Sequence, residues 1–161
     1  WRRVPCSLTG HGLPPDASLH SNMPVRDAIA HGRSRAHLLE SSITQIHQVK
    51  KGNFVGYDHG WQAPQNTQIA TLPLGHADGI GRHFGHHKGS VMINGKKAPI
   101  VGNVCMDLLM VDVTSIDCEE GDKVKFFGEL NTASTFALQG NSISYELITG
   151  LGSRIKRIVK E

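Results

Sequence analysis

The stretch Ala98–Thr114 constrains the fold most, because it contains two apolar runs that are too short for helices. Pro99–Val101 and Leu108–Val113 flank a polar insert that includes Asp107. A short run rich in Val, Ile, Leu and Met, bounded by Gly, Pro and Asp, is typical of a buried strand. A carboxylate is costly to desolvate between two such runs, so we expect Asp107 at a strand end or bend, with partners or facing a site.

Similar short strands, separated by turns, recur along the chain from Leu38 onward. Ser42–Lys50 alternates apolar and polar residues as a half-buried strand does, and Asn94-Gly95 is a strong hairpin signal. The pattern predicts an all-β barrel or sandwich with small helices. Further strands are expected at Phe54–Tyr57, Thr67–Leu74, Ser90–Ile93, Lys97–Val101, Lys123–Gly128 and, at a sheet edge, Arg154–Lys160, with short helices at Thr132–Gln139 and Ser142–Thr149.

Residues 1–37 are rich in Pro, Gly, His and Arg and follow neither a strand period nor a sustained helical one. We interpret them as an irregular linker or a remnant of a preceding domain, with a possible short helix around Pro24–His31. Residues 38–161 then form one domain. Because the sequence starts at Trp1 rather than at a methionine, we expect it to be a piece of a longer polypeptide.

Composition excludes several classes of protein. Of the 161 residues, 39% are hydrophobic and 19% charged, and no apolar run approaches the ~20 residues of a membrane helix. We therefore expect a cytoplasmic protein without membrane contact. The net charge of +3 and the lack of basic stretches interleaved with aromatic residues argue against nucleic-acid binding. Three cysteines without Cys-x-x-Cys spacing favour reduced thiols over a disulfide framework or a zinc site.

Residues 75–89 contain five glycines and four histidines, which no helix or central strand tolerates. A loop of this length inside a domain is usually functional or mobile. It lacks the glycine spacing of a dinucleotide fingerprint. His83, His86 and His87 could chelate a metal, but a glycine loop enforces no ligand geometry, so we favour solvated histidines and no metal site.

Four sequence blocks carry a resemblance to a known family. They are Val55–Tyr57, Ile69–Gly79, Ile93–Asp107 and Ile143–Leu147. In this order they resemble the C-terminal β domain of alanine racemase over roughly residues 38–159. In this chain the blocks contain His76 and Asn103 and are followed by the run Leu108–Val113. With these features they most resemble the racemase half of fused D-alanyl-D-alanine-adding ligase/alanine racemase proteins.

The resemblance implies the C-terminal β-barrel-like domain of a fold type III pyridoxal-phosphate enzyme that interconverts L-alanine and D-alanine for peptidoglycan synthesis. In that family an N-terminal α/β barrel holds the cofactor on a lysine. The C-terminal domain of the other subunit completes the site in a head-to-tail homodimer. Two bases on opposite faces of the substrate α-carbon are needed, and the cofactor withdraws electrons from that carbon.

The resemblance also implies roles for six residues. Tyr57 corresponds to the second base, and Met106 and Asp107 to the wall that binds the substrate carboxylate. His76 replaces a tyrosine that lines the substrate entryway. Arg82 corresponds to an arginine that orients the site through hydrogen bonds, and Ser153 to a contact of the cofactor phosphate.

No lysine of this chain lies in a cofactor-binding context, since Lys96 and Lys97 belong to the expected hairpin. We therefore expect that the chain by itself neither binds pyridoxal phosphate tightly nor racemises alanine. A catalytically silent β module that binds another protein is the alternative. An oligonucleotide-binding barrel, which would bind more weakly as salt is raised, is a third possibility.

Overall fold

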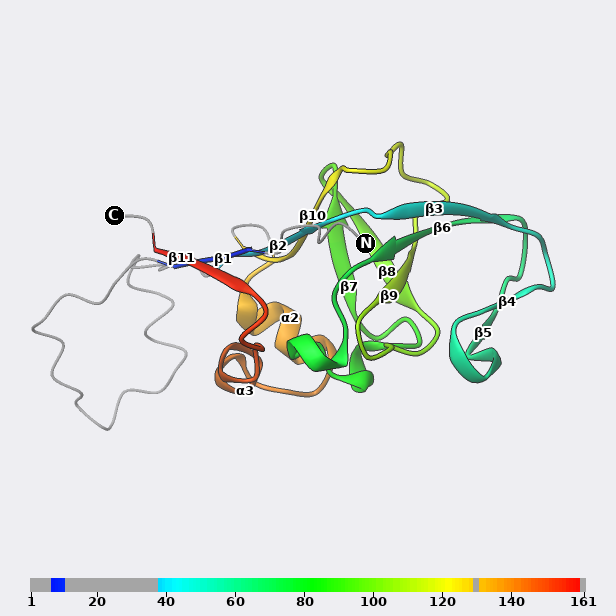
Figure 1. The fold of residues 1–161 in the computed structure, drawn as a ribbon. Coiled ribbons are helices and arrows are strands. Elements are labelled where there is room, and N and C mark those ends of the chain that lie inside the picture. The colour runs from blue at the N-terminus through cyan, green and yellow to red at the C-terminus, as the bar shows by residue number, and fades with distance from the viewer. Residues whose placement is uncertain (1–6, 11–37, 129–130, 160–161) are drawn as a thin grey trace, which may run out of the picture.

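The computed structural model describes residues 7–10, 38–128 and 131–159, and these form a mainly β structure with two short helices (Figure 1). This confirms the predicted fold class. The strands are β1 Ser7–Gly10, β2 Leu38–Ser42, β3 Gln45–Val49, β4 Phe54–Val55, β5 Trp61–Gln62, β6 Thr67–Leu72, β7 Ser90–Ile93, β8 Lys96–Val101, β9 Leu109–Asp112, β10 Lys123–Phe127 and β11 Lys156–Val159. The helices are α2 Ala133–Gln139 and α3 Ser144–Thr149, and three 3₁₀ turns are η1 Tyr57–His59, η2 His76–Asp78 and η3 Arg82–Phe84.

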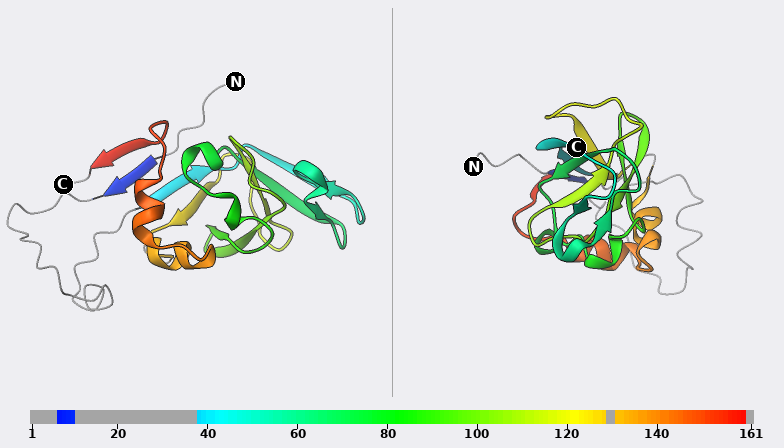
Figure 2. Two further views of the ribbon diagram at one scale, coloured as in Figure 1. Left: turned by 90° about the horizontal axis from the view of Figure 1, so that it is seen from below. Right: turned by 90° about the vertical axis from the view of Figure 1, so that its right-hand side faces the viewer.

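Among the described residues, one sheet of nine strands has the order β11-β1-β2-β10-β7-β8-β9-β6-β3, and β4 and β5 form a separate hairpin. Neighbouring strands are antiparallel except β1 and β11, which are parallel. The sheet curls into a half-barrel (Figure 2). The last strand, β11, lies at one edge as its alternating sequence predicts.

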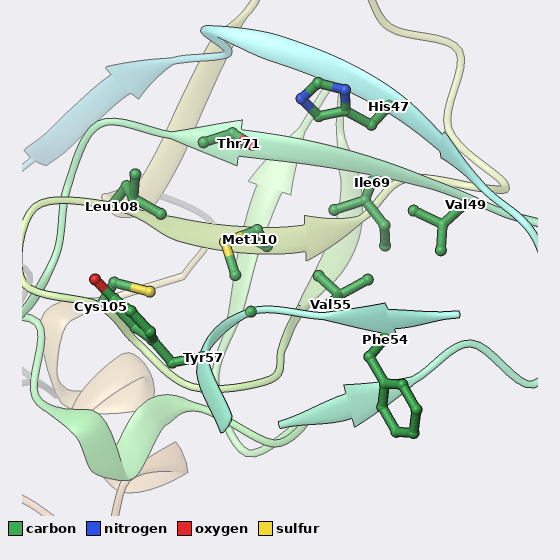
Figure 3. A pocket seen from close by; sticks show the side chains of 11 residues that line it. His47, Val49, Phe54, Val55, Tyr57, Ile69, Thr71, Cys105, Leu108 and Met110 are labelled. Atoms are coloured by element: carbon green, nitrogen blue, oxygen red, sulfur yellow. The ribbon is translucent and has the colours of Figure 1, made fainter. Parts of the chain in front are cut away.

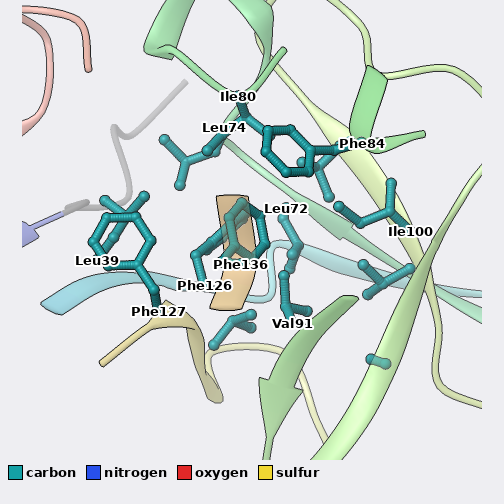
Figure 4. Packing of buried hydrophobic residues seen from close by; sticks show 14 of the residues in the cluster. Leu39, Leu72, Leu74, Ile80, Phe84, Val91, Ile100, Phe126, Phe127 and Phe136 are labelled. Carbon is teal, nitrogen blue, oxygen red and sulfur yellow. The ribbon is translucent and has the colours of Figure 1, made fainter. Parts of the chain in front are cut away.

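The main core fills the concave side of the curled sheet, and α2 covers it (Figure 4). Phe136 of α2 is fully buried, and its ring lies 4.6 Å from that of Phe84 and 6.0 Å from that of Phe126, measured between centroids. Thr132 caps α2 by accepting a hydrogen bond from the Thr135 backbone N–H. Aromatic packing therefore fixes the helix on the sheet.

The hairpin predicted at Asn94-Gly95 is confirmed, because β7 and β8 pair antiparallel across it. Asn94 has φ 48 and Gly95 has φ 77. Two positive φ angles in a two-residue loop suit the twist of the flanking strands, which is why Asn-Gly is favoured there.

Several predicted strands are shorter in the structure, and the cause is visible for two of them. The predicted strand Ser42–Lys50 is interrupted between β2 and β3, where the Ile43 backbone N–H donates to Asp122 and that of Thr44 donates to Thr71. The predicted strand Phe54–Tyr57 ends at Val55, because Gly56 has φ 80 and turns the chain into η1. Tyr57 thus lies on a turn rather than on a strand.

The segment interpreted as irregular, residues 1–37, contributes strand β1, which pairs with β2 and β11. This strand of four residues was not predicted from the sequence. The helix suggested at Pro24–His31 and the first cysteine, Cys6, lie outside the described residues. Cys105 and Cys118 are free thiols.

No helix among the described residues has the length and apolar character that crossing a bilayer requires. No group of three or more His, Cys, Asp and Glu side chains there could hold a metal ion.

Candidate active site

A cavity of about 540 Å³ lies between β3, β6, β9 and the β4–β5 hairpin. Most of its lining is apolar, with Val55, Ile69 and Met110 at its centre (Figure 3). The phenol of Tyr57 and the thiol of Cys105 lie at one end of it (Figure 3). The cavity therefore combines an apolar wall with two exposed groups that can transfer a proton, the Tyr57 phenol and the His47 imidazole.

Tyr57 is presented to solvent by the η1 turn, and 69% of the residue is exposed. The turn begins at Gly56, where a side chain would be strained by φ 80 and would lie 2.9 Å from Cε of Met110. The backbone angle therefore favours glycine here, whereas the flexible Met110 side chain could move away from an added Cβ. The strand–turn junction directs the phenol toward the cavity end rather than into the core.

The polar insert recognised in the sequence forms a bend directly before β9. The Cys105 backbone N–H donates to the Leu108 carbonyl at 3.0 Å, which closes the bend. Met106 is 59% exposed, and the side chain of Asp107 is 61% exposed. Asp107 therefore avoids the desolvation that a position within the apolar runs would impose.

The η2 turn packs its backbone directly on this bend. The His76 backbone N–H donates to Cys105 O and that of Ala77 donates to Met106 O, both at 2.9 Å. A Cβ on Gly75 would lie 2.6 Å from Met106 O and closer still to Cys105 O. Only glycine allows the two backbones to approach this closely.

Arg154 ties the same two segments together through its guanidinium. Its Nε and one terminal nitrogen donate to the two oxygens of Asp78 at 3.0 Å, and the other terminal nitrogen lies 2.7 Å from Asp107. Asp78 is almost fully buried and also accepts from the Gly75 backbone N–H. The hydrogen bond to Asp107 and the charge of Asp78 raise the pKa of Arg154 above its usual value.

Cys105 lies beside Tyr57 but is not an activated thiol. Burial raises its pKa, and this outweighs the lowering by the Tyr57 backbone N–H and by the charge of Arg82. The protonated thiol points to the Asn103 carbonyl at 3.8 Å. Cys105 therefore serves as apolar lining rather than as a nucleophile.

Of the six residues singled out in the sequence, Tyr57 lines the cavity, and the bend that carries Met106 and Asp107 is flanked by Cys105 and Leu108, which also line it. Tyr57 lies on η1, Met106 and Asp107 on the bend, and His76 on η2, with its side chain exposed. Arg82 and Ser153 are exposed, and neither side chain has a hydrogen bond or ion pair within the described part of the chain.

Sequence reasoning missed Arg154 and assigned the orienting hydrogen bonds to Arg82. The assignment of Arg82 stays a prediction, whereas Arg154 donates to Asp78, which is 76 positions earlier. The adjacent Ser153 was singled out, but no local pattern marks its neighbour. Asn103 was noted only as a variant within a block, whereas its side chain donates to the Tyr57 carbonyl at 3.0 Å.

Residues 36–159 match the family model described as "Alanine racemase, C-terminal domain". The chain belongs to this family. It is 40% identical over 121 residues to the alanine racemase of Deinococcus deserti, covering 74% of this chain and 34% of that protein. It is 42% identical over 124 residues to the alanine racemase of Helicobacter acinonychis, covering 74% of this chain and 33% of that protein.

Solved alanine racemase structures share the fold. The Bartonella henselae enzyme, with covalently bound pyridoxal phosphate, matches with a TM-score of 0.74 and 34% identity over 77% of this chain and 35% of its own. The Bacillus anthracis enzyme with bound L-Ala-P matches with a TM-score of 0.78 and 30% identity over 89% of this chain and 37% of its own. The chain thus spans about a third of the length of the curated relatives that it matches.

Proposed function

We propose that this chain is the β domain of an alanine racemase, in which Tyr57 exchanges a proton with the substrate α-carbon and the Met106–Asp107 bend forms part of the substrate wall. One observation carries the proposal: the Tyr57 phenol is exposed at a cavity end, next to a bend that is held by η2 and Arg154. By this proposal the chain interconverts L- and D-alanine for peptidoglycan synthesis, together with a pyridoxal-phosphate barrel.

The described residues fit only one wall of a cofactor site. No lysine or arginine lines the cavity, so the cavity itself offers neither an amine for pyridoxal phosphate nor a cationic cradle for its phosphate. When bound, the cofactor withdraws electrons and makes the α-proton of an amino acid removable. We propose that a barrel domain, in a head-to-tail homodimer, supplies the lysine and the positive charge that favours loss of a phenol proton.

In this arrangement the chain's own residues position and transfer a proton. Tyr57 Oη is the atom that donates or accepts it on one face of the substrate. The Met106–Asp107 bend positions the substrate carboxylate, while the exposed side chain of His76 borders the entryway. Arg82 and Ser153 are assigned, on the family resemblance, to orienting the site and to contacting the cofactor phosphate. The chain alone is expected neither to retain pyridoxal phosphate through gel filtration nor to racemise alanine.

The test is a chimera in which residues 36–159 replace the matching third of the Helicobacter acinonychis alanine racemase. Tyr57→Phe is expected to lower kcat by about 10²–10⁴, the usual contribution of a general acid or base, while circular dichroism is unchanged. Tyr145→Phe is the matched control, because Tyr145 is also 69% exposed but lies on α3, away from the cavity.

A second readout separates a missing base from a damaged site. In deuterated water the Tyr57→Phe chimera should still exchange the α-proton of one alanine enantiomer, because the base on the other face remains. Equal racemisation by Tyr57→Phe and Tyr145→Phe would refute the assignment of Tyr57. A folded chimera that holds the cofactor but racemises nothing would instead favour a catalytically silent β module.

A further inference from the structure

The η1 turn that carries Tyr57 has a backbone that its own sequence does not favour. Asp58 has φ 55 and His59 has φ 49, so two consecutive residues with side chains occupy the left-handed region. Such residues visit this region singly and persist there when surrounding contacts hold them. Contacts from outside the turn are therefore needed to keep Tyr57 in one orientation.

The Tyr57 carbonyl is the point at which the turn is held. It accepts a hydrogen bond from the Gly60 backbone N–H at 2.9 Å and a second from Nδ2 of Asn103 at 3.0 Å. Asn103 comes from the bend 46 positions later. A Cβ on Gly60 would lie 2.8 Å from the same Nδ2, so the asparagine amide packs directly against the end of the turn.

The other end of the Asn103 amide is also engaged. A carbonyl oxygen can only accept, so the amide nitrogen must face Tyr57 and the amide oxygen must face away from it. That oxygen lies 3.0 Å from Nε2 of His86, which therefore carries the proton. His86 is itself fixed, because its backbone N–H donates to Gly102 O at 2.9 Å.

We propose that Asn103 and His86 are positioning residues for Tyr57: the His86 ring orients the Asn103 amide, and the amide holds the η1 turn. The polar contacts form one directed chain, from Nε2–H of His86 to Oδ1 of Asn103 and from Nδ2–H of Asn103 to the Tyr57 carbonyl. That Asn103 and His86 hold the η1 turn follows from these contacts alone. That they thereby affect catalysis rests on the proposed function.

The direct test uses nuclear magnetic resonance on the 161-residue chain, without cofactor or partner. Asn103→Asp keeps the shape of the side chain but replaces the donor with a second oxygen. We expect the Gly60 amide to exchange with solvent about fivefold to tenfold faster, and the order parameters of residues 57–60 to fall. Asn141→Asp is the control, because Asn141 is exposed and makes no side-chain hydrogen bond within the described residues.

The role of His86 is tested by rescue. His86→Asn tolerates the φ of 55 but is too short to reach Asn103, so it should loosen the turn. His86→Gln places an amide nitrogen where Nε2 lies and should restore slow Gly60 exchange, although glutamine suits this backbone less well. Asn141→Asp again serves as the control, because Asn141 has the same φ of 55 and makes no side-chain hydrogen bond within the described residues.

Unchanged Gly60 exchange in Asn103→Asp would overturn the proposal, and unchanged exchange in His86→Asn would remove His86 from it. In the racemase chimera, Asn103→Asp should lower kcat about tenfold to a hundredfold with little change in KM, because a misoriented group loses rate rather than substrate binding. A looser turn in Asn103→Asp, combined with full activity in Tyr57→Phe, would keep the positioning role and reject the proposed function.

Discussion

Gly75→Ala is expected to separate the η2 turn from the bend that carries Met106 and Asp107. The φ of Gly75 is −152, so alanine meets no backbone strain there and the effect is purely steric. The new methyl group would lie 2.6 Å from Met106 O, whereas real Cβ contacts essentially never fall under 3.0 Å. Because the obstacle is backbone rather than a flexible side chain, one of the two segments must move.

The expected loss in the free energy of unfolding comes from this steric clash and from the hydrogen bonds that the movement weakens. Forcing an extra methyl group into a packed site costs about 1–3 kcal/mol. The hydrogen bonds from the His76 and Ala77 backbones, worth about 1 kcal/mol each, weaken as the segments separate. We expect the free energy of unfolding to fall by about 2–4 kcal/mol, a drop in Tm of roughly 6–12 °C for a chain of this size.

Thermal unfolding and the methyl resonance of Met106 together test this reasoning. Gly121→Ala is the control, since Gly121 has φ +97 and no heavy atom within 4 Å of an added Cβ, and strain alone should cost about 1–2 kcal/mol. Gly75→Ala should lower Tm further and shift the Met106 methyl resonance, which Gly121→Ala should not move. Equal losses of Tm with an unshifted Met106 resonance would refute the steric argument.

Two further predictions concern charge and proton binding. Arg154→Met leaves the buried Asp78 carboxylate with the Gly75 backbone N–H as its remaining hydrogen bond, so Tm should fall. Lys156→Met on the exposed strand β11 is the control and should leave Tm unchanged. Equal Tm values for the two variants would contradict a stabilising role of the Arg154–Asp78 contact. Burial raises the pKa of the Cys105 thiol above its usual value, so its alkylation should begin at a higher pH in the folded chain than in urea. Because the folded pKa is the higher one, the thiol stabilises the fold below the pKa of the unfolded chain, and this stabilisation is lost as pH rises through the folded pKa. Equal alkylation midpoints in the two states would contradict this.

Much of the secondary structure was predictable because its determinants lie within a few residues. The Asn94-Gly95 hairpin, the helix capped by Thr132 and the edge strand β11 all follow from local patterns that the structure confirms. Where prediction failed, a single backbone angle or a distant partner decided the outcome. Gly56 ends a strand through its positive φ, and β1 is a strand because β2 and β11 lie on both sides of it.

The residues of the candidate site also fall into two groups, those found from the sequence and those found only in the structure. The sequence by itself determined the family and singled out Tyr57, Met106 and Asp107 through blocks of neighbouring residues. Only the tertiary structure selected Arg154 and Asn103, which act on partners 76 and 46 positions away. Local patterns encode strands and turns because those contacts span a few residues. Which side chains meet across the cavity depends instead on the register and curl of the whole sheet, and no short stretch of sequence records that.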